Sequence, residues 1–259
     1  MRVAIAAAIG VAVVIAQEAP KKAPQPKAAS EVDSLLEQAG TASSHGDNPG
    51  AIKLLQSALA KAQRDPKLRA NGRDAEIMRA MGQVYSRSKQ YPQAVQSFQG
   101  SVGTLGTKCV PGKPIAEQCA DTYYDLGTAQ MYADDFAGAA ATLKKGIPLY
   151  EAMVHGQGRS DYKMAKLKLE ANTESMLAAA IFRSGDLNGA IVMYKRAIQH
   201  YQTVVSNPES GEGLQSLARQ SMAQEQQSIN LLLEEQKKRA AEQKAEPKKD
   251  TPKKDASKK

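Results

Sequence analysis

Apolar side chains recur along this chain at the three- and four-residue spacing of α-helices, in segments separated by short turns. Ala51, Leu54, Leu55 and Ala58 fall on one helical face, directly after the turn-forming sequence GDNPG at Gly46–Gly50. Alanine is abundant and runs of β-branched residues are rare, which also favours helix over strand. The chain is therefore predicted to be all-α. We expect helices at residues 31–44, 50–63, 72–88, 92–104, 115–133, 136–153, 161–184, 188–205 and about 212–244.

Three of the predicted helix pairs share one motif. A small residue on the first helix and an Ala on the second are 12 positions apart, and a large apolar residue follows four positions after the Ala. The three copies are Gly82 with Ala94 and Phe98, Gly127 with Ala139 and Leu143, and Ala178 with Ala190 and Tyr194. The first pair keeps only the offset, from Ala39 to Ala51. Recurrence of fixed residue types at a fixed offset is the signature of a repeat protein.

This motif resembles that of the tetratricopeptide repeat (TPR) family, over about residues 31–206. The resemblance implies an α-solenoid of about four helix pairs, with the helix at 212–244 as a cap over the apolar edge of the last pair. Successive motif alanines are 43, 45 and 51 residues apart, against a usual period of about 34. We therefore expect longer helices or loops, with glycine-containing insertions at 100–114 and 154–160. An unrelated helical bundle would explain one small residue at a packed position, but not three correlated copies.

The resemblance also implies where a ligand would bind, because in such a solenoid the first helices of successive pairs line the concave side. This face is polar with a few large apolar side chains, which suits an extended peptide or a partner helix. The predicted partner-binding residues are Arg79, Gln83, Tyr124, Thr128, Met131, Ser175 and Phe182. Tyr124 and Phe182 are the best individual candidates, because aromatic residues are favoured anchors in interfaces. The alternative is that these positions are only solvated, or that Phe182 packs on the last helix.

Positive charge is concentrated at the two ends of the chain. The net charge is +8, of which residues 237–259 carry +6 and residues 1–29 carry +3, so the body is close to neutral at −1. A neutral body gives no support for a nucleic-acid-binding face. The Lys- and Pro-rich tail at 246–259 is predicted to be disordered. It either serves as a solvated end or attaches the protein weakly to anionic lipid or an envelope polymer.

The N-terminus has the pattern of a secretory signal peptide. Met1 and Arg2 precede an apolar run of 14 residues at Val3–Ala16, shorter than the roughly 20 residues of a membrane span. We expect secretion across the inner membrane to a bacterial periplasm or cell envelope, with cleavage before Gln17. An uncleaved anchor or a buried helix is the alternative.

The chain has two cysteines, Cys109 and Cys119. In an oxidising compartment we expect them to form a disulfide across the intervening Pro- and Gly-containing loop; the alternative is two unpaired thiols. No histidine lies nearby in sequence, so a zinc site at these cysteines is not expected.

The sequence contains no recognisable catalytic constellation. His45, His155 and His200 are far apart and are expected to be exposed to solvent. No metal site and no cofactor is predicted, and the chain is not expected to be an enzyme.

The leading hypothesis is an exported TPR-type adaptor for a protein or peptide; the alternative is an envelope-associated structural protein held by its basic ends. Too few heptads follow residue 212 to establish a coiled coil. The predicted organisation is a signal peptide at 1–16, a linker at 17–29, the repeat domain at 30–206, a capping helix at 207–245 and the tail at 246–259.

Overall fold

The structure is a computed structural model that describes the backbone of residues 27–245 and the side chains of residues 31–242. The predicted signal peptide and tail, and most of the predicted linker, lie outside the described residues. The described part contains ten α-helices, two short 3-10 helices and no strand, which confirms the all-α prediction. The helices are α1 (Lys27–Ser44), α2 (Asn48–Arg64), α3 (Pro66–Ala70), α4 (Arg73–Arg87), α5 (Tyr91–Leu105), α6 (Ala116–Tyr132), α7 (Phe136–His155), α8 (Ser160–Arg183), α9 (Leu187–Ser206) and α10 (Gly211–Ala245). The 3-10 helices are η1 (Gly106–Lys108) and η2 (Pro208–Ser210).

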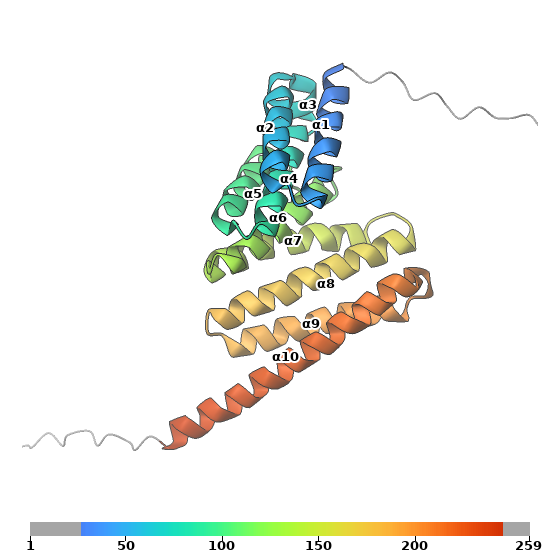
Figure 1. Cartoon of the computed structure of the whole chain (residues 1–259). Helices are drawn as coiled ribbons and strands as arrows, with labels where there is room; N and C mark the ends of the chain where they lie inside the picture. Colours follow the sequence, from blue (N-terminus) through green and yellow to red (C-terminus); the bar gives the residue numbers. More distant parts are fainter. Residues whose placement is uncertain (1–26, 246–259) are drawn as a thin grey trace, which may run out of the picture.

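The helices stack in consecutive pairs to form an α-solenoid (Figure 1). The pairs α1/α2, α4/α5, α6/α7 and α8/α9 follow one another along the stack, and α10 packs on α9 at its end. The axes of α8 and α9 run nearly crosswise to those of α1 and α2, so the stack twists along its length (Figure 1). This arrangement confirms the predicted solenoid.

Close packing within each pair depends on the small motif residue of the first helix. In α4, the ring of Phe98 from α5 lies so close to Gly82 that a Cβ there would be 2.6 Å from the nearest ring carbon. In α6, a Cβ on Gly127 would lie 2.5 Å from Leu143 Cγ. Ala178 is the corresponding residue of α8, and it is fully buried in one cluster with Tyr194. The motif therefore has the packing role that its spacing predicts.

Three of the second helices begin with the same kind of N-cap. Asp47, Asp135 and Asp186 precede α2, α7 and α9, and the carboxylate of each accepts a hydrogen bond from the backbone N–H three residues later. This N-cap satisfies a backbone donor that the first helical turn leaves unpaired. The donor residue is a glycine in all three cases, and a Cβ on it would lie within 2.4 Å of the Asp carboxylate. The shared Asp-x-x-Gly sequence thus starts these three helices in the same way.

Several elements differ from the sequence prediction. Helix α3 was not expected, α1 begins inside the last residues of the predicted linker, and α5 continues to Leu105 inside the predicted insertion at 100–114. On the capping helix, Leu217 and Leu233 are not part of the buried face, since they are 51% and 39% exposed. The buried residues of α10 are instead Ala218, Glu225, Ile229 and Leu232, which recur at helical spacing and face the preceding pair.

None of the described helices has the length and apolar character required to cross a membrane.

Candidate functional site

The first helices of successive pairs lie next to one another in the stack. Helix α4 contacts α6, α6 contacts α8, and α8 contacts α10. We call the surface formed by α4, α6 and α8 around the seven predicted partner-binding residues the first-helix face. Its side chains form hydrogen bonds and ion pairs between neighbouring helices. These interactions determine which side chains of the face can contact a ligand.

Arg79 and Gln83 of α4 both bind one carboxylate of α6. Arg79 Nε donates to Asp125 Oδ2 at 2.7 Å, and Gln83 Nε2 donates to the same oxygen at 3.0 Å. A second Arg79 nitrogen lies 3.4 Å from Asp121. Burial raises the pKa of Asp125, although Arg79 and Gln83 favour its charged form. The two predicted binding residues therefore hold α4 against α6, and three quarters of the Arg79 side chain is covered.

The predicted residues of α6 are also partly engaged. Tyr124 is half-buried and packs against a cluster that contains Leu143 and Leu177, and burial raises the pKa of its hydroxyl. The hydroxyl oxygen of Thr128 is buried. Met131 is half-buried at the end of the helix. Tyr124 is therefore a packing residue that exposes only part of its ring.

Helix α8 is linked to its neighbours on both sides. Its Lys166 pairs with Glu117 of α6, and the hydroxyl of Tyr162 donates to the same carboxylate at 3.0 Å. The predicted binding residue Ser175 donates to Glu225 of α10. Phe182 is 37% exposed, which makes it the most accessible of the predicted apolar residues.

Sequence reasoning found the helices of this face but missed its acidic character. Glu117, Asp121 and Asp125 follow one another at four-residue spacing and form an acidic row along α6. The row is matched in part by Arg79 from α4 and Lys166 from α8. The four-residue spacing of acids was visible in the sequence and could have indicated the row.

The solved structures that share this architecture include the following two. BtubC (BKLC) from P. vanneervenii matches with a TM-score of 0.55 at 16% identity, covering 90% of this chain and 94% of that chain. The kinesin light chain TPR-like repeats of Podosopora anserina match with a TM-score of 0.54 at 16% identity, covering 86% of this chain and all of the other. The fold is TPR-like. No family model and no curated protein matches the chain by sequence.

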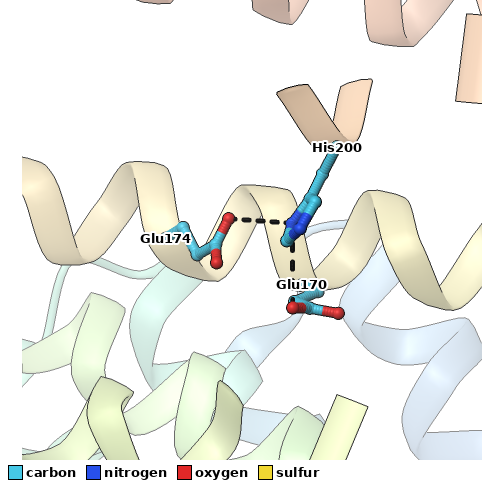
Figure 2. Close-up of side chains that lie close together, drawn as sticks. All are labelled: Glu170, Glu174 and His200. Carbon is cyan, nitrogen blue, oxygen red and sulfur yellow. Dashed lines mark ion pairs between the residues drawn. The ribbon is translucent and has the colours of Figure 1, made fainter. Parts of the chain in front are cut away.

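A second cluster of charged residues lies between the helices of the fourth TPR-like pair, α8 and α9 (Figure 2). His200 of α9 points between Glu170 and Glu174, which lie one turn apart on α8. The imidazole Nδ1 is 3.0 Å from Glu174 Oε2 and 3.7 Å from Glu170 Oε1. The expectation that His200 is exposed to solvent is therefore wrong. Its side chain is 24% exposed, because α8 and α9 pack closely at this level.

Arg196, one turn before His200 on α9, completes this cluster. Its guanidinium lies 2.5 Å from Glu174, 2.5 Å from Glu151 of α7 and 3.5 Å from Glu170. Burial is the main cause that raises the pKa of Glu170, to about 7, and contact with Glu174 is the main cause that raises the pKa of His200. Two pairs of polar residues at four-residue spacing, one on each helix, were the sequence signal for this cluster.

The disulfide between Cys109 and Cys119 fixes the loop before α6. The two Cα atoms are 5.5 Å apart, and Cys119 is fully buried. Beside the loop, a surface cavity of about 550 Å³ is lined by apolar residues that include Val110 and Ile115 and by polar residues that include Lys108. The disulfide-bonded cysteines are sequence neighbours of three residues that line this cavity, Lys108, Val110 and Gln118.

Proposed function

We propose that the chain is an exported TPR-type adaptor that binds a protein or peptide partner through the first-helix face. The observation that carries this proposal is the acidic row of Glu117, Asp121 and Asp125 on α6, the helix that contacts both α4 and α8. Arg79 and Lys166 offset only part of its charge. The best-matched partner is an extended or helical segment with basic side chains for this row and an apolar side chain for Phe182.

The TPR-like fold supports binding rather than catalysis. Arg79, Gln83, Lys166 and Ser175 are used to join helices, so the face is a fixed, preorganised surface. A rigid surface loses little conformational entropy on binding. This favours a scaffold role over one that depends on closure around a substrate.

Substitution on the two faces of the stack tests the proposal. Asp121→Asn keeps the acceptor for Tyr150, whose hydroxyl donates to Asp121 at 2.7 Å, and removes one charge of the acidic row. Phe182→Ala removes the exposed aromatic ring. Val192→Ala is the matched control, because Val192 is 59% exposed on the second helix α9.

Partner association is measured with the full chain by crosslinking and quantitative mass spectrometry in the producing cells. We expect Asp121→Asn and Phe182→Ala together to reduce recovery of one specific protein at least about tenfold, since each interface anchor contributes on the order of 1–2 kcal/mol. Val192→Ala should leave recovery unchanged. Equal recovery from all variants would place the binding site elsewhere.

Export to the periplasm or cell envelope is part of the proposal. The apolar run at Val3–Ala16 supports it, and so does the disulfide, because disulfides persist in oxidising compartments. Mass spectrometry of the protein recovered from the envelope fraction should find Gln17 as the first residue. Recovery of the uncut chain with reduced cysteines from the cytosol would contradict export.

Contact of the Lys-rich tail with anionic lipid or polymer stays a prediction, since residues 246–259 lie outside the described part. Salt-sensitive cosedimentation with anionic vesicles that is lost when the tail is removed would support it.

A further inference from the structure

The charged cluster between α7, α8 and α9 has more negative than positive charge in a buried place. Glu151, Glu170 and Glu174 face one guanidinium, that of Arg196, so the net charge is −2 when all three carboxylates are ionised and His200 is neutral. The Glu174 side chain is fully buried and that of Glu170 is 3% exposed. Burying a carboxylate without full compensation is costly, so this arrangement favours an additional positive charge at the same place.

The arrangement of the possible ligand atoms fits one metal ion. The Nδ1 atom of His200 and one oxygen from each of Glu170 and Glu174 all lie within 4.8 Å of one another. Bonds of about 2.0–2.2 Å to a common ion would hold such atoms roughly 3–3.5 Å apart. The observed distances of 3.0 and 3.7 Å from Nδ1 to the two carboxylates bracket that range.

The buried polar atoms at the centre of this cluster lack hydrogen-bond partners within the described part of the chain. Both oxygens of Glu174 and Nδ1 of His200 are buried, and among the described side chains none makes a hydrogen bond of good geometry with them. The ion-pair contact of Glu174 with Arg196 uses Oε1, whereas Oε2 faces His200. Each carboxylate oxygen of Glu174 can therefore face its own cation.

We propose that Glu170, Glu174 and His200 bind one zinc ion, which links α8 to α9. Imidazole nitrogen with carboxylate oxygens is a common zinc ligand set, whereas calcium and magnesium prefer oxygen ligands alone. Three protein ligands leave a position for water. The ion brings the net charge of the cluster from −2 to zero. Arg196 donates a hydrogen bond to the ligand Glu170 and another to Glu151, which is not a ligand.

The site stabilises the fourth repeat rather than performing chemistry. It joins the two helices of one pair, and α7 also contributes Glu151 to the cluster through Arg196. Zinc that binds only the folded chain raises the melting midpoint by mass action. The proposal is independent of the partner-binding function, because it concerns different residues and is tested without a partner.

The experiment measures zinc binding to the full chain, freed of metal by a chelator, with isothermal titration calorimetry at pH 7.5. We expect one equivalent of zinc to bind, no comparable binding of magnesium or calcium, and a rise in the melting midpoint on the order of 5 °C at free zinc a hundredfold above Kd. Cobalt should bind the same site and give a visible d–d absorption band.

His200→Gln and Glu174→Gln test the assignment, and His155→Gln is the matched control, because His155 is exposed at the end of α7. The first two should weaken zinc binding at least tenfold and remove the cobalt band, while the control keeps both. Circular dichroism checks that each variant is helical, and Glu170→Gln provides a third ligand variant if one fails to fold.

Absence of stoichiometric zinc binding by the wild-type chain would overturn the proposal. So would zinc affinity that survives His200→Gln and Glu174→Gln, because the ion would then sit elsewhere. A melting midpoint that responds to pH but not to zinc would show that protons alone compensate the cluster, and would also overturn it.

Discussion

Replacement of Gly82 by Ala tests the packing on which the stack depends. A Cβ at this position would lie 2.6, 2.7 and 2.8 Å from three carbons of the Phe98 ring. Ordinary contacts between carbon atoms are about 3.5–4.0 Å, so the ring or the helix must move by about 1 Å. Phe98 is only 1% exposed, and its ring has no free space to move into without displacing its neighbours in the core.

The magnitude follows from two opposing effects. Overpacking a filled core costs about 1–3 kcal/mol. The higher helix propensity of Ala over Gly returns about 1 kcal/mol. We therefore expect Gly82→Ala to lower the free energy of unfolding by about 0–2 kcal/mol.

Gly103→Ala is the matched control, because Gly103 is also helical and a Cβ there would meet nothing within 4 Å. This variant gains the higher helix propensity of Ala without any overpacking. It should therefore raise the free energy of unfolding by about 0.5–1 kcal/mol. Urea unfolding followed by circular dichroism measures both variants. If Gly82→Ala proves as stabilising as Gly103→Ala, close contact between α4 and α5 does not depend on the small residue, and the reasoning fails.

Three further predictions concern single elements. Cys109→Ser with Cys119→Ser should lower the free energy of unfolding in urea by about 2–3 kcal/mol, because the loop gains freedom in the unfolded chain; no loss would contradict this. Asp186→Ala removes the N-cap of α9 and should cost about 1 kcal/mol in the same assay, and a neutral result would mean the cap is unimportant. Burial raises the pKa of Glu225, so the charged carboxylate becomes unfavourable as pH rises through that pKa. Glu225→Gln should therefore increase the melting midpoint more at pH 8 than at pH 4, whereas the exposed control Glu234→Gln shows no such difference, and an equal effect at both pH values would refute the assignment.

The sequence predicted the helices and their pairing well, because both depend on local patterns. Helical periodicity and the 12-residue offset are properties of short segments, and Gly82 and Gly127 pack where that offset places them. Helix α3 was missed because its five residues are too few to show a period. Its start is nevertheless marked by Asp65 and Pro66, an N-cap followed by proline.

The details of the two sites could not be predicted in the same way. Whether Arg79 faces solvent or Asp125 depends on how far α6 is shifted and rotated against α4, and no local pattern reports this. The same holds for His200, which lies 26 positions beyond Glu174 and meets it only because α8 and α9 are both long. The four-residue spacings of the polar residues on α6, α8 and α9 are visible in the sequence. Which residues they contact depends on how the helices pack.

Site-specific photocrosslinking in the producing cells tests the central claim, that the first-helix face binds a partner, most directly. A photoreactive phenylalanine analogue replaces Phe182 on α8 in one strain and Val192 on α9 in another, and both positions are exposed. The account predicts a crosslinked partner from position 182 and little or none from position 192. A product formed only from position 192, or equally from both, would contradict it.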